Sequence, residues 1–119
     1  MSIWPIGPIE ERPQVTLESW AVFEVPLNGI DQPWTRHLVG YALEDRQGQV
    51  SSQVIRFDPI SGQCVTPSGR IYRLLRRPGL SSDALYVWQR WKAVASVSEE
   101  REVTEQVRMA MVAAQRRAI

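Results

Sequence analysis

The side chains best suited to binding are arginines that gather in the second half of the chain. Basic and aromatic residues alternate between positions 70 and 92: Arg70, Arg73, Arg76, Arg77, Arg90 and Lys92, interleaved with Tyr72, Trp88 and Trp91. Arginine presents a flat, permanently charged fork that matches carboxylates and phosphates, and an aromatic ring can stack on a base. The pattern predicts a surface that binds an acidic protein or a nucleic acid.

Charge is distributed unevenly along the chain. Residues 1–61 contain eight acidic residues and four arginines, whereas residues 62–119 contain ten basic and five acidic residues. The halves therefore carry −4 and +5, although the whole chain carries only +1. Such an asymmetry points to an acidic or polyanionic partner and says nothing about the fold.

Histidine and cysteine each occur once, at His37 and Cys64. Nucleophilic catalysis would need these two to meet beside a third, orienting group, and one histidine with one thiol cannot build a typical zinc site. Their apolar neighbours predict structural roles for both, with Cys64 as a small buried hydrophobe. No glycine-rich segment has the spacing of a phosphate-binding loop. The sequence therefore predicts no enzyme, no catalytic residue, no metal site and no cofactor.

Length and composition indicate one globular domain. The 119 residues are 44% hydrophobic and include five tryptophans, enough for a packed core. A single cysteine excludes an intramolecular disulfide framework. The first residues lack the pattern of a signal peptide, and no run approaches the roughly 20 apolar residues of a membrane span. We expect a cytoplasmic protein with no membrane contact.

The elements that must position these residues are strands followed by helices. Alternating apolar and polar residues predict five strands, at 16–25, 34–43, 50–57, 63–66 and 70–75. Their regular spacing, with turn signals between them, predicts an antiparallel meander that is strongly curved or barrel-like. Residues 1–14 contain three prolines and no periodicity, which predicts an irregular lead-in.

Trp20 lies on the less apolar face of the first predicted strand. Strict alternation puts Leu17, Ala21 and Phe23 on one face, and Trp20 on the other face with Glu18 and Glu24. Either the last helix covers this second face, or Trp20 belongs to an exposed recognition patch. Trp20 is therefore a candidate contact residue.

The period changes to that of a helix after Gly79. Ser81 is the expected N-cap, and Ala84, Val87, Trp88 and Trp91 share one face, which predicts that both tryptophans are core residues. Ser96 and Glu99 have the spacing of a capping box, which predicts a break and a second helix that runs to residue 118. Its apolar stripe is made of small residues and would either dock on its own domain or form a homodimer. The whole is an α+β domain at 15–119, with its sheet at 15–76 and its helices at 81–118.

Four segments between residues 34 and 91 also resemble a known group of proteins. They are 37–41 (HLVGY), 57–59 (FDP), 66–74 (TPSGRIYRL) and 83–88 (DALYVW). Together they are similar to small uncharacterised proteins of proteobacteria carried on phages, plasmids and integrative elements. The resemblance implies an accessory protein of a mobile element and supplies no catalytic residues.

The sequence as a whole favours a non-enzymatic binding protein that acts on another protein with an acidic surface. Its predicted contact residues are Arg70, Arg73, Arg76, Arg77, Arg90 and Trp20. The alternative is a small barrel that binds nucleic acid through the arginines at 70–77. Salt separates the two, because phosphate contacts weaken steeply as salt rises and an apolar protein contact does not.

Overall fold

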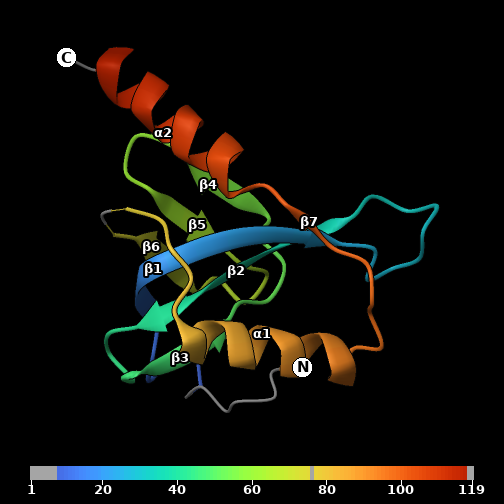
Figure 1. Cartoon of the computed structure of the whole chain (residues 1–119). Coiled ribbons are helices and arrows are strands. Elements are labelled where there is room, and N and C mark those ends of the chain that lie inside the picture. Colours follow the sequence, from blue (N-terminus) through green and yellow to red (C-terminus); the bar gives the residue numbers. More distant parts are fainter. Residues whose placement is uncertain (1–7, 76, 118–119) are drawn as a thin grey trace.

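The computed structural model describes residues 8–75 and 77–117 (Figure 1). Within them the chain is α+β, as predicted, with a mixed sheet and two helices. The strands are β1 (Gln14–Val25), β2 (Thr35–Ala42), β3 (Gln47–Val50), β4 (Arg56–Asp58), β5 (Gln63–Val65), β6 (Ile71–Leu74) and β7 (Arg101–Glu102). The helices are α1 (Ser82–Val94) and α2 (Thr104–Arg117).

The sheet differs from the predicted meander in strand number and in one pairing. Its order is β3-β2-β1-β6-β5-β4, with β7 paired to the end of β1. Residues 14–17 of β1 run parallel to residues 71–74 of β6, and the other pairs are antiparallel. The prediction of five antiparallel strands was therefore wrong. The barrel-like shape is not confirmed either, because the sheet is not closed: β3 and β4 do not pair with each other in the described chain.

The predicted strand at 50–57 is not a single strand. β3 ends at Val50 and β4 begins at Arg56, because the chain between them changes its pairing partner. The amide N–H groups of Ser51 and Val54 donate to carbonyls of β2, at Leu38 and Arg36. One residue later, the N–H of Ile55 donates to Val65 of β5. The chain thus leaves β2 at Val54, and from there β4 accompanies β5.

Strand β1 contains a bulge that reverses its alternation. Ser19 and Trp20 lie opposite the single residue Gly40, and Ser19 has φ 49°. A Cβ at position 40 would lie 3.2 Å from the Cα of Trp20, so the close approach requires glycine there. Because of the extra residue, Leu17 and Trp20 face the same side. The predicted faces were therefore wrong for Leu17, before the bulge, and right for Ala21, Phe23 and Val25 after it.

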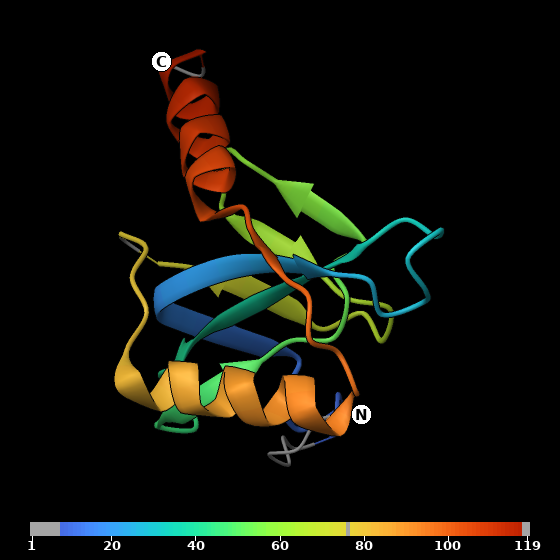
Figure 2. The same cartoon turned by 45° about the vertical axis from the view of Figure 1, so that its right-hand side comes forward.

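The two faces of β1 are covered by different helices (Figure 2). On one side, α1 lies across β2 and β3 and closes a core that contains Phe23, Val39, Trp88 and Trp91. On the other side, the curved sheet encloses a second core, to which Val103 and Val107 contribute from the start of α2. Hydrophobic residues are buried on both faces, so β1 is the central element of the fold.

Helix α1 begins and ends as its caps dictate. The hydroxyl of Ser81 accepts the N–H of Ala84 at 3.2 Å, which confirms the predicted N-cap. At the other end Ser96 has φ 57°, and the N–H groups of Ser96 and Val97 donate to Ala93 and Lys92, a Schellman termination. Ser96 therefore ends α1 and does not open a capping box, and the second helix begins only at Thr104.

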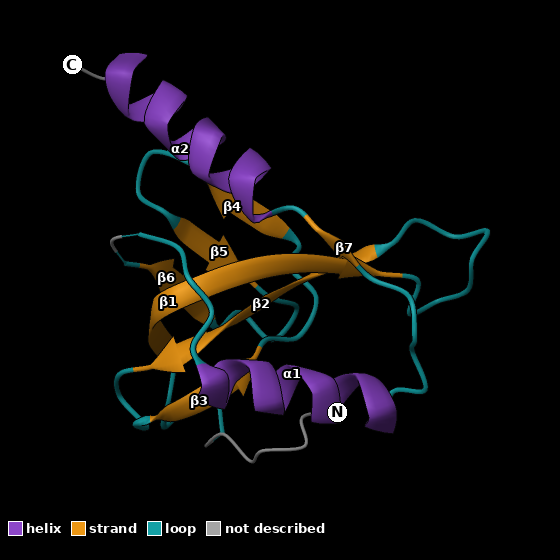
Figure 3. Ribbon diagram, viewed as in Figure 1, coloured by secondary structure: helices purple, strands orange, loops and turns teal. Residues whose placement is uncertain are grey.

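Helix α2 extends away from the sheet beside β4 and the turn between β4 and β5 (Figure 3). Only Val107 and Ala114 of the helix are buried, whereas Met109 is 55% exposed. The helix thus docks on its own domain through a few small residues, which was one of the two expected outcomes. The homodimer stays a prediction, and residues 1–7 of the lead-in and residue 118 of the expected helix lie outside the described residues.

Candidate functional site

The predicted arginines do not share one role in the folded chain. Arg73 and Arg77 are exposed, at the end of β6 and just after it, and Arg90 is exposed on α1. Arg70 is half-buried, and its Nε–H donates to the backbone carbonyl of Arg12 at 2.8 Å, so it ties the segment just before β1 to the sheet. Arg76 lies outside the described residues.

Arg73 and Arg77 form what we call the β6 arginine surface. The cross-strand neighbours of Arg73 are Thr16 on β1 and Gln63 on β5, both polar. Arg77 lines a shallow hollow with Glu18, yet no ion pair joins either arginine to a carboxylate of the described residues. Their charges therefore remain available to an outside partner.

Trp20 is not a surface residue. Its side chain is 1% exposed and belongs to the second core, together with Val103 and Val107. Its assignment as a partner-binding residue was therefore wrong: Trp20 shares a face with Val22, as predicted, and that face is covered by residues that include Val103 and Val107.

His37 and Cys64 are both buried, and burial shifts the pKa of each side chain. The Nδ1–H of His37 donates to the Ser51 carbonyl at 2.9 Å, and its Nε2 accepts from the Thr35 hydroxyl at 2.8 Å. Burial lowers the pKa of His37, against the opposing hydrogen bond to Ser51. Burial also raises the pKa of the Cys64 thiol to about 12, so the thiol is protonated at neutral pH.

The described residues contain neither a metal-binding cluster nor a membrane-spanning helix. No group of three histidine, cysteine or acidic side chains there is placed to hold a metal ion. Neither α1 nor α2, as far as each is described, is long and apolar enough to cross a membrane.

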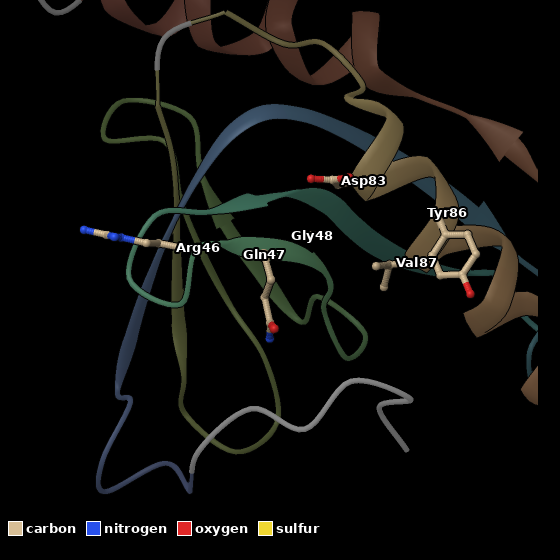
Figure 4. Close-up of a pocket in the computed structure, with 6 residues that line it drawn as sticks. All are labelled: Arg46, Gln47, Gly48, Asp83, Tyr86 and Val87. Atoms are coloured by element: carbon tan, nitrogen blue, oxygen red, sulfur yellow. The ribbon is translucent and has the colours of Figure 1, made fainter.

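Two cavities lie against α1. The first, about 260 Å³, separates the β2–β3 turn from the start of α1 (Figure 4). In this view Arg46 extends away from Asp83, and a Cβ at Gly48 would lie 2.8 Å from the Asp83 carbonyl oxygen. The second, about 210 Å³, is lined by His37 and Trp91, and by Arg70, whose Nε–H is already engaged. Both cavities are features of helix packing.

A third hollow has a different character. It holds about 300 Å³ at the point where β2 and β4 diverge, and it is lined by Glu24, Trp34 and Arg36 on one side and by Val54, Ile55, Arg56 and Phe57 on the other. We call it the Trp34–Arg56 groove. It combines cationic, aromatic and aliphatic side chains from segments that are far apart in the sequence.

Glu24 organises the charged side of this groove. Its Oε2 accepts from Nε and Nη2 of Arg36 at 3.2 and 2.9 Å, and its Oε1 accepts from Nε and Nη2 of Arg101 at 3.1 and 2.8 Å. The Arg101 guanidinium lies 4.2 Å from the centre of the Trp34 ring. Burial tends to raise the pKa of Glu24, but the hydrogen bonds and charges of the two arginines outweigh it, and the net shift is downward.

The sequence interpretation missed this groove because its arginines are not clustered along the chain. Arg36, Arg56 and Arg101 come from β2, β4 and β7, and only the strand pairing brings Arg36 and Arg101 to Glu24. The one available signal was the acidic Glu24 within an otherwise apolar half-strand, which needs a charged partner when partly buried.

No family model, curated protein or solved structure matches the chain. The resemblance of residues 34–91 to proteins of mobile elements therefore stays a prediction.

Proposed function

We propose that this chain is a non-enzymatic binding protein that contacts an acidic surface of another protein through the β6 arginine surface. The observation that supports this is the exposure of Arg73 and Arg77, neither of which has an ion-pair partner among the described residues. Arg73 lies on a strand that is paired on both sides, so its backbone position is fixed, and Arg77 follows that strand. Guanidinium groups suit carboxylates of a partner.

The other predicted contact residues have different places in this proposal. Arg90 also has no ion-pair partner in the described chain, but it lies on the helix and not on the sheet, so it serves as a matched control. Arg70 binds the backbone of Arg12, in the segment just before β1, and its loss would disturb the fold.

The test is the double variant Arg73→Glu, Arg77→Glu, compared with Arg90→Glu. Exposed charges contribute little to stability, so all variants should melt close to the wild type. Co-purification from the native host, with and without nuclease, should lose its specific protein partner in the double variant and keep it in the control. Undiminished binding by the double variant would contradict the proposal.

The same experiment decides the nucleic-acid alternative. Capture that disappears after nuclease treatment, and a retained oligonucleotide whose affinity falls steeply with salt, would replace the protein partner by a nucleic acid. Capture that survives nuclease supports the protein partner.

A further inference from the structure

The Trp34–Arg56 groove carries more positive charge than its own carboxylate balances. Arg36 and Arg101 share the single carboxylate of Glu24, and Arg56 is exposed with no ion-pair partner among the described residues. The four groups therefore sum to +2. Next to Arg56, Ile55 is 56% exposed, so its apolar side chain is open to a partner.

Two of the cationic groups, Arg36 and Arg101, are already held in place. Each of the two uses its Nε and Nη2 on one oxygen of Glu24, which leaves the donors on Nη1 of both guanidinium groups for another acceptor. The Arg101 guanidinium lies over the ring of Trp34. Because these side chains are ordered before a ligand arrives, little conformational entropy is lost on binding.

From this arrangement we infer that the groove is a second recognition site, which binds a short peptide segment with an acidic residue next to a large apolar one. The acidic side chain meets Arg56 and the free donors of Arg36. The apolar side chain packs on Val54, Ile55 and Phe57, which lie beside Arg56 in the sequence and line the same hollow.

The composition of the groove favours a peptide over a nucleic acid. A strand of nucleic acid needs a continuous track of cations and aromatic faces that are open for stacking. Here the Glu24 carboxylate lies between two of the arginines, aliphatic side chains form one wall, and Arg101 covers the Trp34 ring from one side. An acidic and apolar peptide meets both kinds of surface at once.

This site goes beyond the proposed function, since it shares no residue with the β6 arginine surface, and either can fail without the other. The test begins with selection of peptides from a random display library against the full chain. Fluorescence anisotropy then gives the affinity of a selected peptide for the wild type and for Arg56→Glu, Ile55→Asp and Arg73→Glu.

We expect the selected peptides to share an acidic residue beside an apolar one. Loss of the charge contact or of the apolar contact should weaken binding at least about tenfold in Arg56→Glu and in Ile55→Asp. Arg56→Lys should retain part of the affinity, and Arg73→Glu should change it less than about twofold. Thermal melts show that each variant is folded.

Three results would overturn the inference. One is a selection that yields no common acidic and apolar motif. Another is a selected peptide that binds Arg56→Glu and Ile55→Asp as tightly as it binds the wild type. The last is a labelled ten-residue oligothymidine that binds the wild type more tightly than the peptide and loses its affinity in Arg56→Glu, which would assign the groove to nucleic acid.

Discussion

The two faces of β1 carry different kinds of side chain. On the face toward α1, Phe23, Trp88, Trp91 and His37 form a continuous set of ring contacts, with centroids 4.9 Å apart for Phe23 and Trp88, 5.3 Å for the two tryptophans, and 4.6 Å for Trp91 and His37. On the opposite face the core contains Trp20 and Tyr72 among aliphatic side chains, and Val103 and Val107 contribute to it from the segment at the start of α2. Toward its end, that same face carries Glu24 and opens into the Trp34–Arg56 groove.

This difference separates the buried part of the molecule, which provides stability, from the part that we propose meets a partner. Large aromatic side chains bury the most apolar area, so the aromatic set beside α1 and Trp20 on the other face contribute strongly to the free energy of folding. The second face has a core of its own and ends in ordered charges that reach solvent. Variants in either core should therefore change stability more than variants at the charged end.

The largest effect is expected for Trp88→Ala, compared with Val107→Ala on the opposite face. Trp88 is fully buried, and its truncation leaves a cavity between α1 and the sheet, which should cost about 3–5 kcal/mol. Val107→Ala removes two methyl groups and should cost about 2 kcal/mol. Urea unfolding measures both, and a larger loss for Val107→Ala would contradict the core role given to Trp88.

A smaller effect is expected for Glu24→Gln, at the open end of the second face. The variant keeps the shape of the side chain but removes the charge that binds Arg36 and Arg101, which should cost about 1–2 kcal/mol at pH 7. Because the folded-state pKa of Glu24 lies below its ordinary 4.5, this contribution is present above pH 4.5 and is lost as pH falls further. Unfolding curves of the variant and the wild type should therefore converge in acid, and a constant difference down to pH 3 would exclude the role given to the carboxylate.

The smallest effect is expected from the protonation of His37, on the α1 side. Burial lowers its folded-state pKa, so the unfolded chain binds its proton more readily, and stability falls as pH drops below 6.5. The slope is at most about 1.4 kcal/mol per pH unit for one proton. His37 is the only histidine, so His37→Gln should remove the slope between pH 6.5 and 5.5. A slope that survives in this variant would assign it to another group.

Local sequence patterns predicted most of the strands, but they did not predict how the strands pair or where β1 contains a bulge. Alternation located most of the strands, and the spacing of Trp88 and Trp91 correctly placed both tryptophans in the core. The parallel pairing of β1 with β6 was missed because it joins residues more than fifty positions apart and leaves no periodic signal. The bulge at Ser19 was missed because nothing in the sequence, such as a glycine, marks it, and this single extra residue put Leu17 on the opposite face from the one predicted.

The candidate sites show the same limit. Clustering along the sequence pointed to residues 70–92, where Arg73 and Arg77 are indeed exposed, but Arg70 proved to have a structural contact. The most ordered arginines, Arg36 and Arg101, come from strands far apart in the chain and meet only through Glu24. Clustering of arginines along the sequence therefore indicates that some of them are exposed, whereas strand pairing decides which arginines meet a carboxylate.

The separation of stability from recognition is tested most directly by a map of backbone amide NMR shifts during titration with a selected acidic and apolar peptide. The account predicts that the largest shifts fall at residues 34–36, 54–57 and 101, which line or support the groove. Amides of α1 and of residues 71–75 should stay nearly unchanged. Largest shifts on α1, with the groove unaffected, would contradict the account.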